Sequence, residues 1–355
     1  MKLSLKIIEW YHKNRRDLPW RNIKNPYLIW LSEIILQQTR VNQGLQYYKN
    51  FCHRYPNIEN LAEAKEEEVM KLWQGLGYYS RARNLHKTAK IIVNEYQGNF
   101  PDDFLELKSL PGIGHYTASA IASMAFNKKY PVIDGNVQRV LSRLLSIKDP
   151  VDTSLGQKKI LNAAYQLIDP KSPGTYNQAI MELGALICKP AKPLCGQCPV
   201  KKDCIAKREG NPESYPLKSK TVRKRIRHFH YLFFRIGDEN NLNTLIHKRT
   251  GKDIWRNLYD FPLIESVTPL DKKELINSNQ FKRFIGNYRY ELEDISELVI
   301  HKLTHQDIHT RFFIIRIKDL LRLQHYLLVP LNSLYDYPIS KLAENFLRNS
   351  GIKIK

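Results

Sequence analysis

Two acidic residues, Glu33 and Asp134, occupy sequence contexts that favour different protonation states of their carboxyl groups. Glu33 lies within the apolar run WLSEIIL, where loss of water raises the pKa of a carboxyl group and keeps it protonated near neutral pH. Asp134 precedes an apolar helical stripe that starts at Val137, which places it at a helix N-terminus. Each residue alone fits a structural role, as a solvent-facing glutamate or a simple cap. Together they fit a general acid and an ionised carboxylate that stabilises a cation.

A turn rich in glycine and proline, residues 110–114, lies ahead of Asp134. Pro111 lacks an amide donor, and Gly112 and Gly114 are expected to supply the left-handed angles of a tight turn. Two short helices joined by such a turn leave free amides at the start of the second helix, and these amides can hold a phosphate. An ordinary helix-turn-helix core contact is the alternative.

Four of the five cysteines lie close together in the sequence with the spacing C-x6-C-x2-C-x5-C: Cys188, Cys195, Cys198 and Cys204. In a cytosolic protein such a group indicates a metal site and not disulfides. Zinc and a [4Fe–4S] cluster both accept four thiolate ligands. Zinc modules usually bring two close C-x2-C pairs, and this sequence has one. Cys52 has no near partner and is expected to be a packed free thiol.

The elements that must carry these groups change character near residue 206. Before that point the chain reads as helices, one of which opens at Asn25-Pro26 and carries Glu33. Residues 206–227 combine structure-breaking Gly and Pro with a run of Lys and Arg, which predicts a basic, DNA-facing linker. Beyond it the pattern changes to a period of two, which predicts a strand-rich second domain. The alternating residues expected on one face of the first strand are Phe229, Tyr231 and Phe233.

The composition favours a soluble protein that binds a polyanion. The chain has 355 residues, long enough for two or three domains, and 43% of them are hydrophobic. Lys and Arg number 56 against 35 Asp and Glu, giving a formal net charge of +21, and this balance favours nucleic acid as a partner. No apolar run is long enough to span a membrane, and the charged start is not a signal peptide. We therefore expect a cytoplasmic, nucleoid-associated protein that does not bind a membrane.

The turn and the following carboxylate carry a family resemblance. The sequence LPGIGHYTASAIASMAF, followed by VIDGNVQRVLSRL, resembles the helix-hairpin-helix glycosylase superfamily, in which a catalytic Asp follows the hairpin. Further motifs resemble the MutY-type adenine DNA glycosylases: LPWR at residues 18–21, SEIILQQT at 32–39 and GLGYYSRAR at 75–83. The cysteine spacing matches the cluster motif of the MutY and endonuclease III families, so a [4Fe–4S] cluster is the expected cofactor.

The resemblance implies roles for the site residues. Glu33 is expected to act as the general acid and Asp134 to stabilise the cationic sugar, with Asn136 in the same catalytic site. Tyr116 occupies the position at which endonuclease III-type relatives carry a Schiff-base lysine, so no efficient strand-cleaving lyase step is expected. An apolar or aromatic tip on the turn at residues 75–79 could wedge between base pairs, although its side chains could equally belong to the core. The residues expected to contact DNA are Arg21, Gln37, Gln38, Thr39, Leu76, Tyr78, Gly112 and Gly114.

The second domain resembles the Nudix-like domain of MutY-type enzymes. WRNLYDFP at residues 255–262 matches their W-x-x-L-x-x-F-P strand, but the Nudix catalytic helix with its magnesium-binding carboxylates is missing after it. Pyrophosphatase chemistry is therefore not expected. The family's lesion-reading F-S-H is represented by Leu303-Thr304-His305, and Thr304 and His305 are assigned to contact the base opposite adenine.

The expected fold class is a mainly α helix-hairpin-helix glycosylase domain at residues 1–205, which includes the cluster segment at 188–204. A basic linker at 206–227 and an α+β Nudix-like lesion-recognition domain at 228–355 follow. The expected activity is monofunctional, hydrolytic removal of adenine opposite 8-oxoguanine or guanine in double-stranded DNA, by a monomer in base excision repair.

Two alternatives remain at this point. One is an endonuclease III-like glycosylase and lyase for oxidised pyrimidines, against which Tyr116 and the second domain both argue. The other is a non-catalytic DNA-binding protein with a structural cluster, against which the presence of both Glu33 and Asp134 argues.

Overall fold

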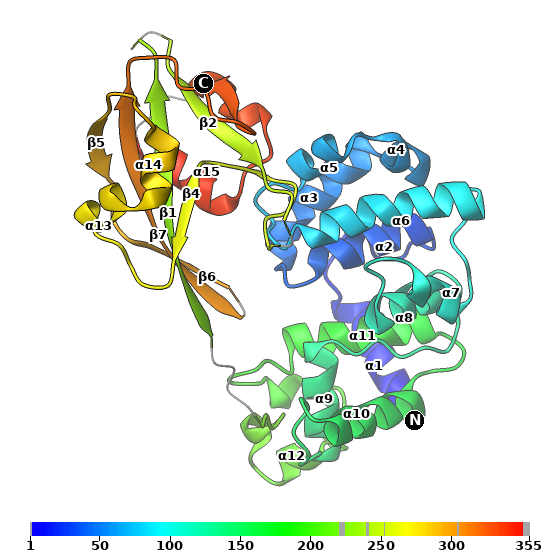
Figure 1. The fold of residues 1–355 in the computed structure, drawn as a ribbon. Coiled ribbons are helices and arrows are strands. Elements are labelled where there is room, and N and C mark those ends of the chain that lie inside the picture. The colour runs from blue at the N-terminus through cyan, green and yellow to red at the C-terminus, as the bar shows by residue number, and fades with distance from the viewer. Residues whose placement is uncertain (1, 220–223, 239–240, 252, 304, 351–355) are drawn as a thin grey trace. The chain divides into compact units, whose positions relative to one another are not determined.

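The structure is a computed structural model that describes residues 2–219, 224–238, 241–251, 253–303 and 305–350. The chain divides into two compact units, and Figure 1 shows the helices of the first and the sheet of the second. The first unit comprises Met1–Ala64 and Asn84–Thr221, and the second comprises Lys65–Arg83 and Val222–Lys355. The sequence did not predict that residues 65–83 would group with the second half of the chain.

Helices of the first unit begin where the sequence places caps. Asn25 accepts a hydrogen bond from the amide of Leu28 at 3.2 Å, and Pro26 occupies the first turn, so α2 starts at the predicted position. The helices that lie wholly in this unit are α1 (Leu3–Asn14), α2 (Pro26–Leu36), α3 (Val41–Arg54), α4 (Ile58–Glu63), α7 (Phe104–Ser109), α8 (His115–Met124), α9 (Gly135–Leu145), α10 (Ser154–Leu167), α11 (Pro173–Leu186), η1 (Cys195–Gln197), α12 (Ile205–Arg208) and η2 (Pro212–Ser214). A further helix, α6 (Ser80–Tyr96), crosses the division between the two units.

Helix α11 is central to the core of the first unit, because it contacts α1, α8 and α9. Its Ile180 and Leu183 are buried together with Tyr11 of α1 and Val140 of α9. A Cβ atom added at Gly184 would lie 2.6 Å from Cβ of Asn136, closer than two such atoms can approach. Gly184 therefore permits the start of α9 to sit directly against α11.

Much of the range predicted as a linker is folded. It contains most of α12 and all of η2, and the carbonyl of Leu217 accepts a hydrogen bond from the amide of Val151 at 3.0 Å. The first strand of the second unit already begins at Arg225. Among the described residues, no helix combines the length and the apolar character needed to cross a membrane.

The second unit is built on a mixed sheet whose central pair, β1 and β7, runs parallel from Arg225↔Gln306 to Ile236↔Ile317. The sheet order is β3-β2-β1-β7-β5, with β4 also paired to β1, β6 to β7 and β8 to β2. Its strands are β1 (Arg225–Ile236), β2 (Asn243–Lys248), β3 (Tyr259–Asp260), β4 (Leu263–Ser266), β5 (Glu291–Ile295), β6 (Val299–Lys302), β7 (Gln306–Ile317) and β8 (Leu327–Pro330). Its helices are α5 (Glu66–Leu72), α13 (Lys272–Asn277), α14 (Asn279–Ile285), η3 (Leu331–Asp336) and α15 (Lys341–Asn349).

The strand predicted at residues 228–233 is confirmed as part of β1, but both of its faces are covered, because residues 229–234 are all buried. One face packs Leu232 and Phe234 against the core of α13 and α14. The other face lies against α15, where the rings of Phe233 and Phe346 are 5.2 Å apart. A central strand covered on both faces needs apolar residues on both, which a period of two does not describe.

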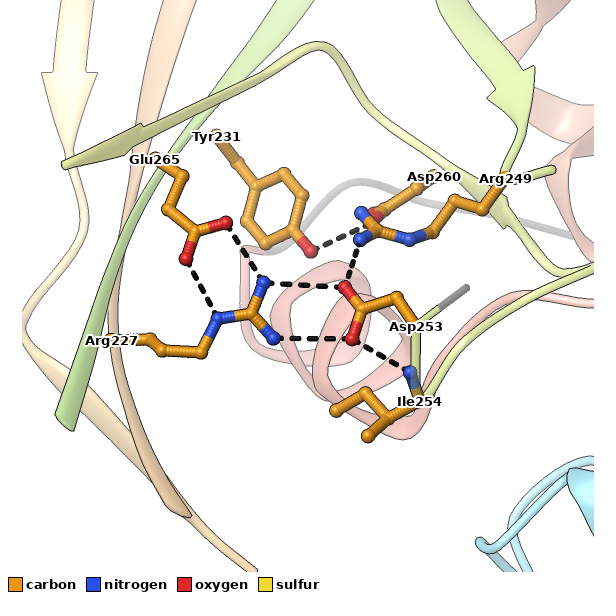
Figure 2. Close-up of polar contacts among 7 residues, drawn as sticks. All are labelled: Arg227, Tyr231, Arg249, Asp253, Ile254, Asp260 and Glu265. Carbon is orange, nitrogen blue, oxygen red and sulfur yellow. Dashed lines mark hydrogen bonds and ion pairs between the residues drawn. The ribbon is translucent and has the colours of Figure 1, made fainter. Parts of the chain in front are cut away.

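A partly buried ion network fixes the start of β1 to the loop that precedes β3. Arg227 donates to Asp253 at 3.1 Å and to Glu265 at 2.7 Å, and Arg249 donates to Asp253 at 2.6 Å and to Asp260 at 3.0 Å (Figure 2). Burial raises the pKa of Asp260 to about 6, although Arg249 and the hydroxyl of Tyr231 favour its ionised form. Arg227 was predicted to belong to a DNA-facing linker. That interpretation is wrong, because two carboxylates of this unit engage its guanidinium.

Candidate active site

Helix α2 buries Glu33 as the sequence predicts. The side chain is surrounded by the apolar residues of α2, and the residue is only 8% exposed. Burial raises the pKa of its carboxyl group, and the nearby carboxylate of Asp134 adds to that effect. A hydrogen bond from Tyr116 and the positive charge of Arg21 act in the opposite direction. Glu33 is therefore a carboxylic acid that keeps its proton to higher pH than an exposed glutamate.

The carboxyl group of Asp134 caps α9 and is held by hydrogen bonds. One oxygen accepts from the amide of Val137 at 2.7 Å, and the other accepts from Nδ2 of Asn136 at 2.7 Å. Burial raises the pKa of Asp134, while these two hydrogen bonds and the charge of Arg139 lower it. Because more donors reach Asp134 than Glu33, Asp134 is the carboxyl group that ionises more readily.

Tyr116 lies in the first turn of α8 and interacts with both acids. Its pKa is raised well above the usual value, first by burial and then by the charges of Glu33 and Asp134. The ring therefore stays neutral and its hydroxyl is a hydrogen-bond donor to Glu33. Its hydroxyl also lies 3.6 Å from the sulfur of Met181 on α11.

Arg21 is held beside this group by a buried acid that the sequence reasoning missed. Its Nη2 donates to Glu182 of α11 at 3.1 Å, and Arg16 donates to the same carboxylate at 2.7 and 2.8 Å. The Glu182 side chain is only 1% exposed, and its two arginines lower its pKa despite burial. The Nε of Arg21 is buried without a partner among the described residues. Glu182 stands in the apolar run AIMELGAL, the same signal that identified Glu33.

The predicted polar residues after α2 leave the helix next to α8. Nε2 of Gln37 donates to the hydroxyl of Thr117 at 3.2 Å, and the hydroxyl of Thr39 donates to the carbonyl of Gln37 at 3.4 Å. Gln38 adopts a left-handed conformation with φ of 56°. This strained conformation directs the chain away from the helix axis immediately after the turn that carries Glu33.

The hairpin between α7 and α8 contains one left-handed glycine, and the prediction of two is wrong. Gly112 has φ of 78°, and a Cβ there would lie 2.6 Å from Cβ of Asn84. Gly114 is extended, with φ of −84°, and serves as the N-cap of α8. A single left-handed residue is enough to reverse the chain, and no side chain caps the amides of α8. These amides are therefore suited to a phosphate.

The turn at residues 75–79 exposes one of its two candidate side chains. Tyr78 is 43% exposed and left-handed at φ of 48°, whereas Leu76 is 7% exposed. Gly75 and Gly77 bracket the turn with positive φ angles. Of the two residues predicted to wedge into DNA, only Tyr78 presents a large side chain to solvent.

Of the two predicted lesion-reading residues, the structure describes His305, which directly precedes β7. His305 is exposed, and its carbonyl accepts a hydrogen bond from the amide of Arg225 at 3.0 Å. Thr304 lies outside the described residues. The strands on either side, β6 and β7, pair antiparallel from Val299↔Thr310 to Lys302↔Asp307.

The four clustered cysteines line one pocket. Burial and the three neighbouring sulfurs raise the pKa of Cys198 to about 11. Nη1 of Arg143 lies 3.4 Å from the sulfur of Cys188, and the side chains of Lys201 and Lys207 also line the pocket. Within the described residues no group of three or more His, Cys, Asp or Glu is gathered closely enough to bind a single metal ion.

Arg139 connects the cysteine segment to Asp134, and no sequence signal singled it out. Its guanidinium donates to the carbonyl of Cys188 at 2.7 Å, to the carbonyl of Gly184 at 2.8 Å and to Oδ1 of Asn136 at 2.8 Å. Arg139 thus orients the amide group that in turn donates to Asp134.

Replacing Gly184 with alanine should destabilise the protein and displace the start of α9. The added Cβ would meet Asn136 at 2.6 Å, and overpacking of this kind costs about 1–3 kcal/mol of unfolding free energy. Denaturant unfolding followed by helical circular dichroism measures the loss. Gly135→Ala is the matched control, because nothing lies within 4 Å of a Cβ at Gly135. Equal stability of the two variants would contradict the close packing of α11 on α9.

The comparisons with known proteins agree with this geometry. Residues 31–163 match the HhH-GPD superfamily of base excision DNA repair proteins, and residues 233–349 match the NUDIX domain. The chain is 37% identical to the adenine DNA glycosylase of Buchnera aphidicola subsp. Acyrthosiphon pisum over 97% of each chain. It is 45% identical to the mouse adenine DNA glycosylase over 56% of this chain and 41% of that one.

The solved structures support the same helical fold. A thermostable thymine-DNA glycosylase is 29% identical, with a TM-score of 0.54, over 58% of this chain and 95% of that one. Endonuclease III in a non-covalent DNA complex is 22% identical, with a TM-score of 0.50, over 58% and 94%, a likeness of fold alone. Because the similarity to the Buchnera enzyme extends along nearly the whole of both sequences, the chain belongs to the family of MutY-type adenine DNA glycosylases within the helix-hairpin-helix superfamily.

Proposed function

We propose that this protein is a monofunctional adenine DNA glycosylase that removes adenine paired with 8-oxoguanine or guanine. The observation that supports the proposal is the pair of carboxyl groups of Glu33 and Asp134, both of which interact with Tyr116. One of them is set up to hold a proton and the other to ionise, which is the division of roles that acid-assisted glycosidic cleavage requires. Its substrate is double-stranded DNA, bound by a monomer in the cytoplasm at the nucleoid.

The adenine must leave the duplex, because its glycosidic bond is inaccessible inside the base stack. Glu33 then donates its proton to the purine, and the bond between the base and the sugar breaks as neutral adenine departs. The Asp134 carboxylate stabilises the positive charge that develops on the sugar. Water adds to the sugar carbon, and its proton passes to the Glu33 carboxylate. Tyr116 has no amine and cannot form an imine with the sugar, so the strand remains uncut.

The second unit is proposed to recognise the base opposite adenine. His305 is exposed at the connection between β6 and β7, where its side chain can meet a base edge, and Thr304 precedes it in the sequence. One or two such hydrogen bonds discriminate between bases by about 1–3 kcal/mol.

A [4Fe–4S] cluster is proposed as the resident cofactor, held by Cys188, Cys195, Cys198 and Cys204. Burial raises the pKa of the Cys198 and Cys204 thiols, so a cationic centre is needed to hold them as thiolates, and the set of four cysteines fits an iron–sulfur cluster. The bound cluster would supply cross-linking of the segment that follows α11. Arg143 bonds the carbonyls of Lys189 and Pro190 at 2.6 and 2.8 Å and so holds the same segment to α9.

The activity should appear as release of adenine from duplexes that contain adenine opposite 8-oxoguanine, and more slowly from adenine opposite guanine. Glu33→Gln should retain duplex binding and lose excision by about 10²–10⁴-fold, because only the proton donor is removed. Duplex binding is measured by titration, and the excision rate by a single-turnover assay. A parallel reaction with borohydride detects any covalent protein–DNA complex. Strong borohydride trapping, or preferred cleavage of thymine glycol or of thymine opposite guanine, would replace the proposal with a different glycosylase.

The excision rate should depend on pH through both carboxyl groups. The rate should fall as pH rises through the pKa of Glu33, which burial raises, because the protonated form is the donor. It should fall as pH decreases through the pKa of Asp134, because the ionised form stabilises the sugar. Asn136→Ala removes a hydrogen bond that lowers the pKa of Asp134, so the acidic limb should move to higher pH while the alkaline limb stays. Movement of the alkaline limb alone would reverse the two assignments.

Purified protein should contain about four iron atoms per chain and no stoichiometric zinc, as expected for a [4Fe–4S] cluster. Cys198→Ser should lose iron and solubility, because Cys198 is one of the four ligands. Cys52→Ser is the control, since Cys52 is a free thiol outside the group and should retain iron. One zinc per chain without iron would refute the cluster.

A further inference from the structure

Residues 65–83 belong to the second unit because its side chains bind them at several points. Glu66 accepts a hydrogen bond from Nδ2 of Asn257. The carboxylate of Glu67 accepts from Nζ of Lys248 at 3.0 Å and from the hydroxyl of Tyr259 at 3.3 Å. The interaction with Lys248 is the first cause of the lowered pKa of Glu67. The start of this segment is therefore attached to the β2–β3 region by an ion pair and two neutral donors.

The middle and the end of the segment have their own attachments. The hydroxyl of Tyr79 donates to the carbonyl of Ile339 at 3.4 Å and accepts from the amide of Gly75 at 3.3 Å. Nη1 of Arg83 donates to the carbonyl of Arg256 at 2.6 Å. Attachments on both sides of residues 75–79 hold this turn as part of the second unit.

The turn that carries the exposed Tyr78 is itself well ordered by internal bonds. Nε1 of Trp73 donates to the carbonyl of Gly77 at 3.0 Å, and Nη2 of Arg81 donates to the same carbonyl at 3.2 Å. The guanidinium of Arg81 lies 5.8 Å from the centre of the Tyr78 ring and 5.0 Å from that of Trp73. We call residues 73–81 the Tyr78 turn.

The ion network of Figure 2 connects the loop of Arg256 and Asn257, which binds residues 65–83, to the strands next to His305. Asp253 binds Arg227 and Arg249, and these two bonds fix the loop that contains Arg256 and Asn257. Arg227 lies on β1 opposite Ile308 of β7, three residues after His305. A short series of bonds therefore runs from the strand that follows His305 to the segment that carries Tyr78.

We infer that Lys248 and Asn257 are positioning residues, which hold the Tyr78 turn in the same compact unit as His305. Insertion of the Tyr78 ring beside the mispair and recognition of the opposite base by His305 then occur as one event, because the second unit presents both side chains. This inference rests on the proposed function. Loosening the attachment should slow extrusion of adenine while leaving the carboxyl groups of the active site unchanged.

Charge reversal and its rescue test the attachment in the full-length protein. Lys248→Glu and Glu67→Lys should each lower the single-turnover excision rate on adenine opposite 8-oxoguanine by about fivefold, the upper range for an exposed ion pair. The double variant restores opposite charges and should recover to within about twofold of the unchanged protein. A 2-aminopurine placed next to the mispair should show a smaller fluorescence rise with the single variants, because unstacking by the Tyr78 ring is reduced.

Lys282→Glu in α14 is the matched control, since Lys282 is exposed and makes the same charge change away from residues 65–83. It should leave the rate and the fluorescence rise unchanged. The inference is overturned if Lys248→Glu behaves like this control, or if the double variant shows no recovery. Absence of adenine excision by the unchanged protein would instead overturn the proposed function. Unchanged binding of undamaged duplex by every variant separates positioning from a loss of DNA affinity.

Discussion

The buried guanidinium of Arg139 is the interaction on which the first unit depends. It takes the carbonyls of Gly184 and Cys188 and the side-chain oxygen of Asn136 as partners, all within 2.8 Å. A buried guanidinium that loses its acceptors is costly, because its charge is then neither hydrated nor bonded. The end of α11 and the first cysteine must therefore keep their places for Asn136 to keep its own. This explains how a cysteine segment without acidic or basic catalysts affects the site: it supplies part of the framework that orients Asp134.

The carboxyl groups of Glu33 and Asp134 differ in the hydrogen bonds that they receive, although burial raises the pKa of both. Glu33 is surrounded by the apolar residues of α2 and receives one donor, whereas Asp134 receives an amide and a side-chain donor at the start of α9. Burial raises the pKa of both, so burial alone does not distinguish acid from carboxylate. The number of donors does. Arg21 adds a positive charge near Glu33, but its partner Glu182 neutralises much of that charge. Glu33 therefore keeps a raised pKa. Arg21 and Glu182 form an ion pair beside it.

The sequence predicts features governed by short-range chemistry and misses those governed by tertiary contacts. The start of α2 at Pro26, the cap at Asp134 and the raised pKa of Glu33 follow from neighbours in the chain. Arg139 resembles any polar residue of an amphipathic helix, because its acceptors come from α11 and the segment after it. Burial of β1 on both faces depends on α15, which lies more than a hundred residues later. The attachment of residues 65–83 is equally non-local, since its partners Lys248, Asn257 and Ile339 lie more than 150 residues away in the sequence.

The ion network of the second unit shows that part of the basic charge is neutralised within the fold. A formal charge of +21 favours a polyanionic partner, but the charge on Arg227 and Arg249 is used within the fold by Asp253, Asp260 and Glu265. Lys224 likewise pairs with Asp307 at 2.9 Å. Each lysine or arginine that neutralises a DNA phosphate adds about 0.9 to the salt dependence of binding, and residues engaged in this way contribute nothing to it. Lys224, Arg227 and Arg249 therefore stabilise the second unit, and the uncapped amides at the start of α8 are a separate place suited to a phosphate.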